Sequence, residues 1–184
     1  MDEMTIKIRN SAERYGLVAR ALHWSIGLLI VAQLVVGFWT FEFMERTAAR
    51  SANIGLHKAL GVVLLILVLL RVGWRLYDQP PPLPASVGAQ ERVGARLGHM
   101  LLYILMVAMP ILGLLTNDTG GRPTDVFGIF TIPLMIGENE ELHGFFEDAH
   151  KVGAYALGIL IVFHLAAAAM HKFVRKDGVT ERML

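Results

Sequence analysis

The chain of 184 residues contains no cysteine. This absence excludes disulfide bonds, cysteine-ligated iron–sulfur clusters, thiolate nucleophiles and haem attached covalently through a C-x-x-C-H motif. Charge is also scarce, because Asp, Glu, Lys and Arg make up 18% of the residues against about 25% in soluble domains. The net charge of +1 provides no overall basic field, so we expect no binding to nucleic acid.

The chain contains long runs without charged residues. Residues 21–41, 97–117 and 152–171 contain no Asp, Glu, Lys or Arg. A bilayer core of about 30 Å requires about 20 apolar residues of helix, so each run is long enough to cross a membrane. A shorter run over 59–70 reaches this length when extended to 53–74. The extension admits Lys58 and Arg71 near opposite ends, where long cationic side chains can reach the headgroups.

We therefore predict an all-α integral membrane four-helix bundle, with residues 1–184 forming one domain. The predicted spans are residues 18–41, 53–74, 97–116 and 147–174. Four spans place both termini on one side of the membrane, and that side carries 12 of the 17 Lys and Arg residues. Because such residues are enriched on the cytoplasmic face, we expect both termini to be cytoplasmic. The first hydrophobic segment is long enough to stay in the membrane, so a cleaved signal peptide is not expected.

Two connections have a distinctive composition. The segment from Asp78 to Pro84 contains four prolines and is predicted to be a non-helical linker. The apolar piece over 126–137 contains Gly128 and Pro133 and is too short to cross, so we expect it to lie at the membrane interface. Pro110 lies inside the third predicted helix and predicts a kink there.

Histidine is unusually frequent for so apolar a chain, and ionisable groups inside membrane spans are candidates for function. The seven histidines are His23, His57, His99, His143, His150, His164 and His171. His150 and His164 are 14 residues apart, which is about 21 Å of helical rise and within about 40° around the helix axis. One helix thus offers two ligands on the same side of the bundle, one near each membrane surface.

The depths of the other histidines predict the partners of these two. His23 opens the first span near the surface where His164 lies, and His57 opens the antiparallel second span near the surface where His150 lies. A haem iron needs an axial ligand from each side. The pairs His23/His164 and His57/His150 therefore predict two haems stacked across the bilayer, with the first pair on the inner iron and the second on the outer iron.

A packing argument separates these four histidines from the other three. A haem that lies against a helix needs a small residue about one turn from its ligand. Four positions later than the chosen histidines stand Gly27, Gly61, Ala154 and Ala168, whereas the other three are followed by Tyr103, Glu147 and Arg175.

Alternative interpretations remain open at the level of the residues. Histidines at helix ends can be interfacial side chains, and glycines in spans often serve helix–helix contact. His143, Glu147 and His150 have the spacing of a zinc site on the outer end of the fourth span. Gln33, near mid-membrane, is best interpreted as an interhelical hydrogen-bond donor or acceptor.

Several short segments resemble one family in their order and spacing. They are Leu22-His23-Trp24, Leu56-His57-Lys58, Leu70-Arg71-Val72-Gly73-Trp74-Arg75, Gly98-His99, Phe127-Gly128 with Ile132-Pro133, and His150 with the run from His164 to His171. On these segments the chain resembles the bacterial four-helix cytochrome b561 family, within the wider group of membrane di-haem b cytochromes. The resemblance covers nearly the whole chain.

The resemblance implies a location, cofactors and a substrate. It implies a multi-pass protein of the bacterial inner membrane, with two bis-histidine b haems on the positions of His23, His57, His150 and His164. It also implies a quinone, such as ubiquinone, near the inner haem at the family position of His171. In one branch it implies oxidation of superoxide with transfer to ubiquinone. Lys172 departs from the family pattern, in which a second histidine often follows.

Four cationic residues are further candidates around these groups. Arg71 and Arg75 are predicted to contact the quinone or the haem propionates. Lys58 and Lys151 directly follow the proposed outer ligands, and we predict that they form a positive patch at the outer haem edge. With these two lysines included, the outer connections carry five cations against nine acidic residues, so such a patch would be local.

Three functions follow as hypotheses. The first is an oxidoreductase or electron carrier that works alone between the periplasmic side and the quinone pool, with superoxide or a redox protein as donor. The second is a cytochrome b subunit that anchors a dehydrogenase or hydrogenase and passes its electrons to quinone. The third, a small ion transporter, leaves the paired histidines unexplained.

Overall fold

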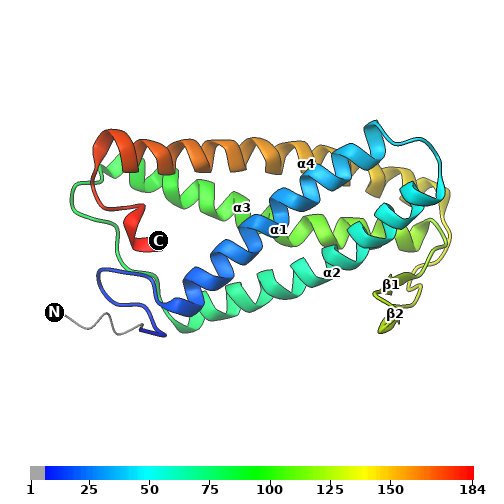
Figure 1. The fold of residues 1–184 in the computed structure, drawn as a ribbon, viewed down its shortest axis with the longest axis horizontal. Coiled ribbons are helices and arrows are strands. Elements are labelled where there is room, and N and C mark those ends of the chain that lie inside the picture. The colour runs from blue at the N-terminus through cyan, green and yellow to red at the C-terminus, as the bar shows by residue number, and fades with distance from the viewer. Residues whose placement is uncertain (1–6) are drawn as a thin grey trace.

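The computed structural model describes residues 7–184 and consists mainly of four long antiparallel helices (Figure 1). They are α1 (Leu17–Glu42), α2 (Ala48–Tyr77), α3 (Ala89–Thr119) and α4 (Glu140–Ala169). A π-helix over Met170–Arg175 prolongs α4, and a short 3-10 helix, Glu181–Met183, lies near the C-terminus. All four long helices are long and apolar enough to cross a membrane, which confirms the predicted all-α bundle.

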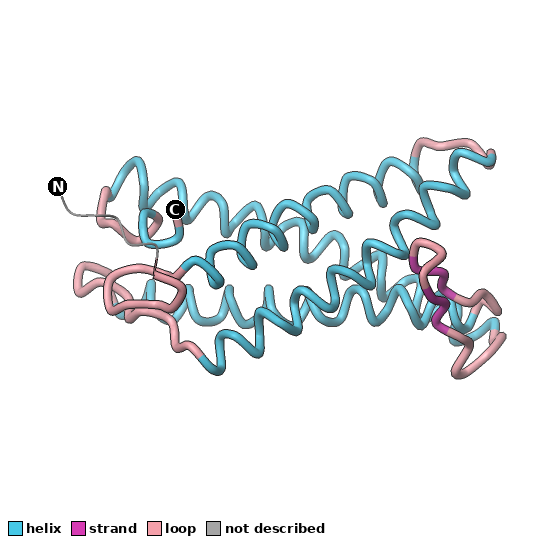
Figure 2. The backbone as a smooth tube through the Cα atoms, turned by 60° about the horizontal axis from the view of Figure 1, so that its bottom comes forward, coloured by secondary structure: helices cyan, strands magenta, loops and turns pink. Residues whose placement is uncertain are grey.

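The two ends of the bundle differ. The beginning of α1 and the C-terminus lie at one end, together with the α2–α3 linker (Figure 1). At the other end lies a two-stranded antiparallel hairpin, β1 (Thr124–Val126) and β2 (Phe130–Ile132), on the connection between α3 and α4 (Figure 2). We call the first the terminal end and the second the hairpin end.

The helices are longer than the spans predicted from charge-free runs. α2 begins at Ala48 rather than at residue 53, and α4 begins at Glu140 rather than at residue 147. The Thr47 hydroxyl accepts a hydrogen bond from the Arg50 N–H, and the Asn139 side chain accepts one from the Leu142 N–H. These N-caps start each helix in a polar turn, because a cap depends on backbone donors and not on hydrophobicity. Charge-free runs mark where lipid begins and not where a helix begins.

The bundle has a small buried centre and a broad apolar exterior. α1 packs on α2, α2 on α3 and α3 on α4. The central cluster consists of Ile26, Ile30, Leu64, Val68, Met109 and Leu157. Other large apolar side chains point outward, among them Leu28 (69% exposed) and Phe163 (67% exposed). Apolar exposure on this scale is unfavourable in water, so these faces suit contact with lipid hydrocarbon.

The hairpin was not predicted from the sequence. Buried polar residues at the end of α3 hold it in place by hydrogen bonds. Asn117 donates to the Thr124 hydroxyl at 2.7 Å and to the Pro123 carbonyl at 3.2 Å. The Asp118 carboxylate accepts hydrogen bonds at 2.9 Å from the N–H groups of Met135 and Ile136. The apolar run over 126–137 contains no helical period, and its backbone groups are satisfied by strand pairing and by these side chains.

We predict that Asn117→Ala lowers the thermal stability of the purified protein. The substitution leaves the Thr124 hydroxyl, the Pro123 carbonyl and the Lys58 ammonium without their Asn117 partner. A buried polar group left unsatisfied costs about 1–3 kcal/mol, and each kcal/mol lowers Tm by about 2–4 °C in a chain of this size. Thermal unfolding in detergent should show a fall of about 2–12 °C. Gln79→Ala, which removes an exposed amide at the terminal end, is the control, and equal Tm values for the two variants would contradict the role of Asn117.

Candidate functional site

Two pairs of histidines face one another across the bundle. Near the hairpin end, the ring centroids of His57 on α2 and His150 on α4 are 6.3 Å apart, with the ring planes at 83°. Toward the terminal end, the rings of His23 on α1 and His164 on α4 are 6.1 Å apart at 74°. The structure thus brings together the two pairs predicted from depth. Leu157, buried in the central cluster, lies midway between the two histidines of α4.

The separation within each pair fits two imidazoles that share one metal atom. A metal–imidazole bond is about 2.0 Å long, as in zinc sites. A five-membered ring with bonds of about 1.35 Å has a radius of about 1.15 Å. These lengths place the centroids of two rings on opposite sides of one metal about 6.3 Å apart, close to the values of 6.1 and 6.3 Å in the structure.

Glycines on facing helices make room for the rings of the outer pair. A Cβ atom at Gly37 on α1 would lie 3.2 Å from Cε1 of His57, and one at Gly113 on α3 would lie 3.1 Å from Cε1 of His150. Both distances are shorter than ordinary van der Waals contact. A larger residue at either position would therefore push against the imidazole that it faces.

These two glycines were not predicted from the sequence, which pointed to the small residues four positions after each histidine on the same helix. Those residues do not face the rings: a Cβ at Gly27 would meet no protein atom within 4 Å. A Cβ at Gly61 would meet only the Gln33 side chain, at 3.7 Å. The glycines that face the outer rings are on neighbouring helices, so they can be identified only when the helix pairing is known.

A backbone carbonyl fixes the orientation of His150. Nδ1 of His150 lies 3.0 Å from the carbonyl oxygen of Met109 on α3. Because a carbonyl can only accept, Nδ1 carries the proton and Nε2 remains free as a ligand atom. A second nitrogen bonded in this way is typical of metal-ligating histidines.

The same arrangement recurs one heptad closer to the hairpin end. Nδ1 of His143 donates to the Thr116 carbonyl at 2.8 Å, and a Cβ at Gly120 would lie 3.1 Å from its ring. No second histidine faces this ring within residues 7–184; its Nε2 lies 3.6 Å from the carboxylate of Glu147. The same described residues contain no cluster of three metal-ligating side chains, so the zinc alternative gains no support.

Gln33 acts on the backbone of the second helix. Its side-chain amide donates to the His57 carbonyl at 2.8 Å, and Gln33 is buried at 7% exposure. This contact confirms the interhelical hydrogen bond expected for Gln33. It ties α1 to α2 at the position of a proposed ligand.

Three imidazoles gather at the terminal end. His99 on α3 lies 5.6 Å from His164, closer than His23 does. Proximity to His164 therefore does not by itself distinguish His23 from His99 as a ligand. The separation of 5.6 Å is about half an ångström shorter than that of His23 and His164, and it fits two rings around one metal less well.

Arginines surround these imidazoles. Nε of Arg71 donates to the Tyr103 hydroxyl at 3.0 Å, and the Arg75 guanidinium lies 5.6 Å from the centre of the Tyr103 ring. Within residues 7–184, three buried N–H donors near this end of the bundle have no acceptor: Nε of Arg20, Nη1 of Arg71 and Nε1 of Trp74. Buried donors are normally paired. Their presence together fits the binding of a group that carries oxygen acceptors, such as the carboxylates of a haem.

Protein atoms already engage the two lysines predicted at the outer haem edge. Lys58 donates to the side-chain oxygen of Asn117, and the Lys151 ammonium lies 3.9 Å from the Glu42 carboxylate. Lys58 is half-buried, whereas Lys151 is 62% exposed. The acidic partner of Lys151 offsets part of its charge.

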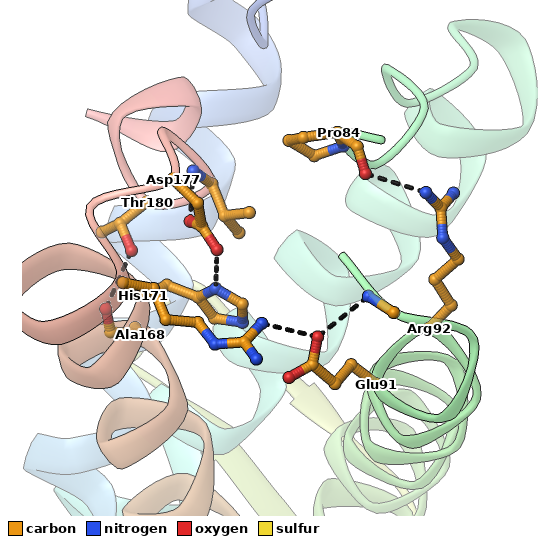
Figure 3. A network of polar contacts seen from close by, with 10 residues as sticks. Pro84, Glu91, Arg92, Ala168, His171, Asp177 and Thr180 are labelled. Carbon is orange, nitrogen blue, oxygen red and sulfur yellow. Dashed lines mark hydrogen bonds and ion pairs between the residues drawn. The ribbon is translucent and has the colours of Figure 1, made fainter. Parts of the chain in front are cut away.

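His171 forms a close pair with Asp177 at the terminal end. Nδ1 of His171 lies 2.6 Å from Oδ2 of Asp177, and both side chains are largely buried (Figure 3). Burial alone would raise the pKa of Asp177, but hydrogen bonds from His171 and from the Val179 N–H lower it below its usual value. The carboxylate is therefore ionised at neutral pH.

Comparisons with known proteins agree with this arrangement. The chain is 33% identical over 178 residues to cytochrome b561 homolog 2 of Escherichia coli (strain K12), covering 95% of this chain and 93% of that protein. It is 27% identical to the probable superoxide oxidase CybB of Yersinia pestis, over 94% of this chain and 96% of that protein. It is 29% identical to cytochrome b562 of Cereibacter sphaeroides, over 92% of this chain and 94% of that protein.

The family model described as prokaryotic cytochrome b561 matches residues 14–184. This range contains all four long helices and every histidine of the two pairs. The relatives are matched over nearly their whole length, so the likeness extends to the complete bundle. The chain belongs to the prokaryotic cytochrome b561 family of membrane electron-transfer proteins.

Proposed function

We propose that the protein is a transmembrane di-haem b electron carrier that exchanges electrons between the periplasmic side and the quinone pool. The observation that carries the proposal is the pair of imidazole separations, 6.1 and 6.3 Å, at opposite ends of one bundle. When bound, haem b supplies reversible one-electron transfer. Two such groups within one chain would connect the two membrane surfaces.

The chain's own residues hold these groups. His23 and His164 are the proposed inner ligands, and His57 and His150 are the proposed outer ligands. The Met109 carbonyl orients His150, and Gly37 and Gly113 leave room for the outer rings. The unpaired donors of Arg20, Arg71 and Trp74 are suited to carboxylate oxygens at the terminal end.

A quinone is proposed as the electron acceptor at the terminal end. A quinone carbonyl needs a hydrogen-bond donor, and its reduction needs protons from a surface. His171 and Arg75 are at this end of the bundle, and His171 carries an imidazole nitrogen that is not bonded to Asp177. The excess of Lys and Arg on this side supports a cytoplasmic location for both termini in the bacterial inner membrane.

Superoxide is proposed as one electron donor on the hairpin side. The support is the likeness to a probable superoxide oxidase at 27% identity over nearly the whole chain. Oxidation of superoxide releases one electron and dioxygen, so the outer haem would accept one electron for each molecule. An extrinsic dehydrogenase or hydrogenase as donor is the alternative, and the experiments below distinguish it.

The first prediction concerns haem stoichiometry. Pyridine haemochrome analysis of the purified protein should give two haems b per chain. His164→Ala removes a ligand of the inner pair and should leave one haem, whereas His99→Ala should keep both. One haem in the native protein, or full occupancy in His164→Ala, would contradict the assignment.

The second prediction concerns the glycines that face the outer rings. Gly113→Val should displace the His150 ring and Gly37→Val the His57 ring, so each variant should lose up to half of its haem and change the spectrum of the outer haem alone. Gly94→Val is the matched control, because Gly94 is an exposed glycine of α3 and a Cβ there meets nothing within 4 Å. Native haem content and spectra in both test variants would show that these contacts do not position the ligands.

The third prediction concerns the electron donor. In a stopped-flow experiment, superoxide should reduce the purified protein without any added subunit, and ubiquinone should then reoxidise it. Because Glu42 offsets the charge of Lys151 and Lys58 is held by Asn117, we expect Lys151→Gln to slow the reduction less than threefold. If superoxide leaves the haems oxidised, while a dehydrogenase encoded beside this gene reduces them, the protein is a membrane anchor.

A further inference from the structure

The segment after α4 folds back over the terminal end of the bundle as a strap, residues 176–184. The Thr180 hydroxyl donates to the Ala168 carbonyl at 2.9 Å, and Nε1 of Trp24 on α1 donates to the Met183 carbonyl at 3.0 Å. The backbone N–H of Tyr15 donates to the Arg182 carbonyl at 3.1 Å. These bonds attach the strap to α4, α1 and the N-terminal segment, so its position is fixed from several sides.

The strap places a carboxylate against His171. Asp177 is its second residue, and its Oδ2 accepts from Nδ1 of His171 at 2.6 Å, while Oδ1 accepts from the Val179 N–H at 3.2 Å (Figure 3). The side chains of His171 and Asp177 are 14% and 8% exposed. The carboxylate is thus itself held in place, and it can fix both the rotation and the tautomer of the imidazole.

His171 continues the row of histidines along α4. His143, His150, His164 and His171 follow one another at multiples of seven residues, and positions seven apart on a helix differ by only about 20° around the axis. His171 lies two turns beyond the proposed inner ligand His164, about 10 Å along the axis. The helix is wider here, because Met170–Arg175 is a π-helix, a feature frequent at functional sites.

Three of these four histidines bond an acceptor through Nδ1. His143 and His150 use carbonyl groups of α3, and His171 uses Asp177. In each case Nε2 is the nitrogen left for chemistry. His171 differs from the others because its acceptor is an ionised side chain, which is the partner typical of histidines that transfer protons.

A second ion pair lies close to His171 and Asp177. Arg175 on the π-helix and Glu91 at the start of α3 are joined at 2.6 Å (Figure 3). Glu91 also accepts from the Gly88 N–H at 3.0 Å. Arg175 and Glu91 are thus paired with each other, and Asp177 is the carboxylate that bonds His171 directly.

We propose that Asp177 is a positioning residue for His171 in the reduction of quinone, an inference that rests on the function proposed above. Reduction to quinol takes two electrons, which arrive from the haems, and two protons. His171 first takes a proton at Nε2 from water at the surface, and the Asp177 carboxylate stabilises the imidazolium that forms. It then gives this proton from Nε2 to a quinone oxygen and keeps the Nδ1–H that Asp177 holds, while the second quinol proton comes from water.

The test compares the haem-loaded protein with variants, using ubiquinone-1 as the probe. Pre-reduced protein is mixed with ubiquinone-1 and haem oxidation is followed. Asp177→Asn keeps the shape of the side chain but removes its charge, and it should slow oxidation about 10- to 100-fold, the usual cost of losing a residue that orients a functional histidine. Asp177→Glu should recover part of the rate. Glu181→Gln, which removes another carboxylate of the strap, should oxidise at the native rate.

A second readout does not depend on electron transfer. In protein with ¹⁵N-labelled histidine, nuclear magnetic resonance should show His171 as the Nδ1–H tautomer. In Asp177→Asn the same ring should become a mixture of tautomers, with haem content and haem potentials unchanged. A native tautomer and a native oxidation rate in Asp177→Asn would overturn the positioning role.

Two further variants separate the possible failures. If ubiquinone-1 oxidises the His171→Gln protein slowly but oxidises Asp177→Asn at the native rate, the positioning role is wrong and the proposed quinone function stands. If the His171→Gln protein is oxidised at the native rate, His171 has no part in quinone reduction. Both the positioning role of Asp177 and the proposed role of His171 are then wrong. Thr180→Val loosens the strap without touching the pair; a loss of rate equal to that of Asp177→Asn would assign the effect to the strap and overturn the inference.

Discussion

The arrangement of the whole bundle depends on holding two imidazoles about 6 Å apart across its interior, once near each end. Each pair takes one ring from α4. The second ring comes from α1 at the terminal end and from α2 near the hairpin end. The spacing of the helices at the two ends, and the small hydrophobic centre between them, are consistent with this one requirement.

The contact between α3 and α4 shows how the rings are kept in place. A heptad on α4, from His143 to His150, is matched by a heptad on α3, from Thr116 to Met109, whose carbonyls accept from the two rings. Gly120 and Gly113 repeat the same step and give the rings space. Two antiparallel helices that keep a common register over seven residues therefore create equivalent ring positions, and the one at His150 faces His57.

The four helices and the two histidine pairs could be predicted from the sequence, because both depend on the spacing of residues along single helices. Uncharged runs gave the four helices, and a spacing of 14 residues with the depth of each span gave the two pairs. The helix ends at Ala48 and Glu140 were missed, because capping depends on polar residues outside the hydrophobic runs.

Features that depend on which helix faces which were not predictable. Gly37 and Gly113 contact rings on other helices, and His99 approaches His164 although its i+4 residue is a tyrosine. Lys58 bonds Asn117, a residue 59 positions away, rather than remaining free at the surface. The pair of His171 and Asp177 needs the turn that follows the π-helix, for which the sequence carries no periodic signal.

The central claim is that each pair of imidazoles holds one iron. Anomalous diffraction from crystals of the purified protein, recorded at the iron absorption edge, locates iron without reference to the rest of the density. The account predicts two peaks per chain about 20 Å apart, since the α4 ligands are 14 residues apart. One peak should lie between His23 and His164 and the other between His57 and His150. A single peak, or an inner peak between His99 and His164, would contradict it.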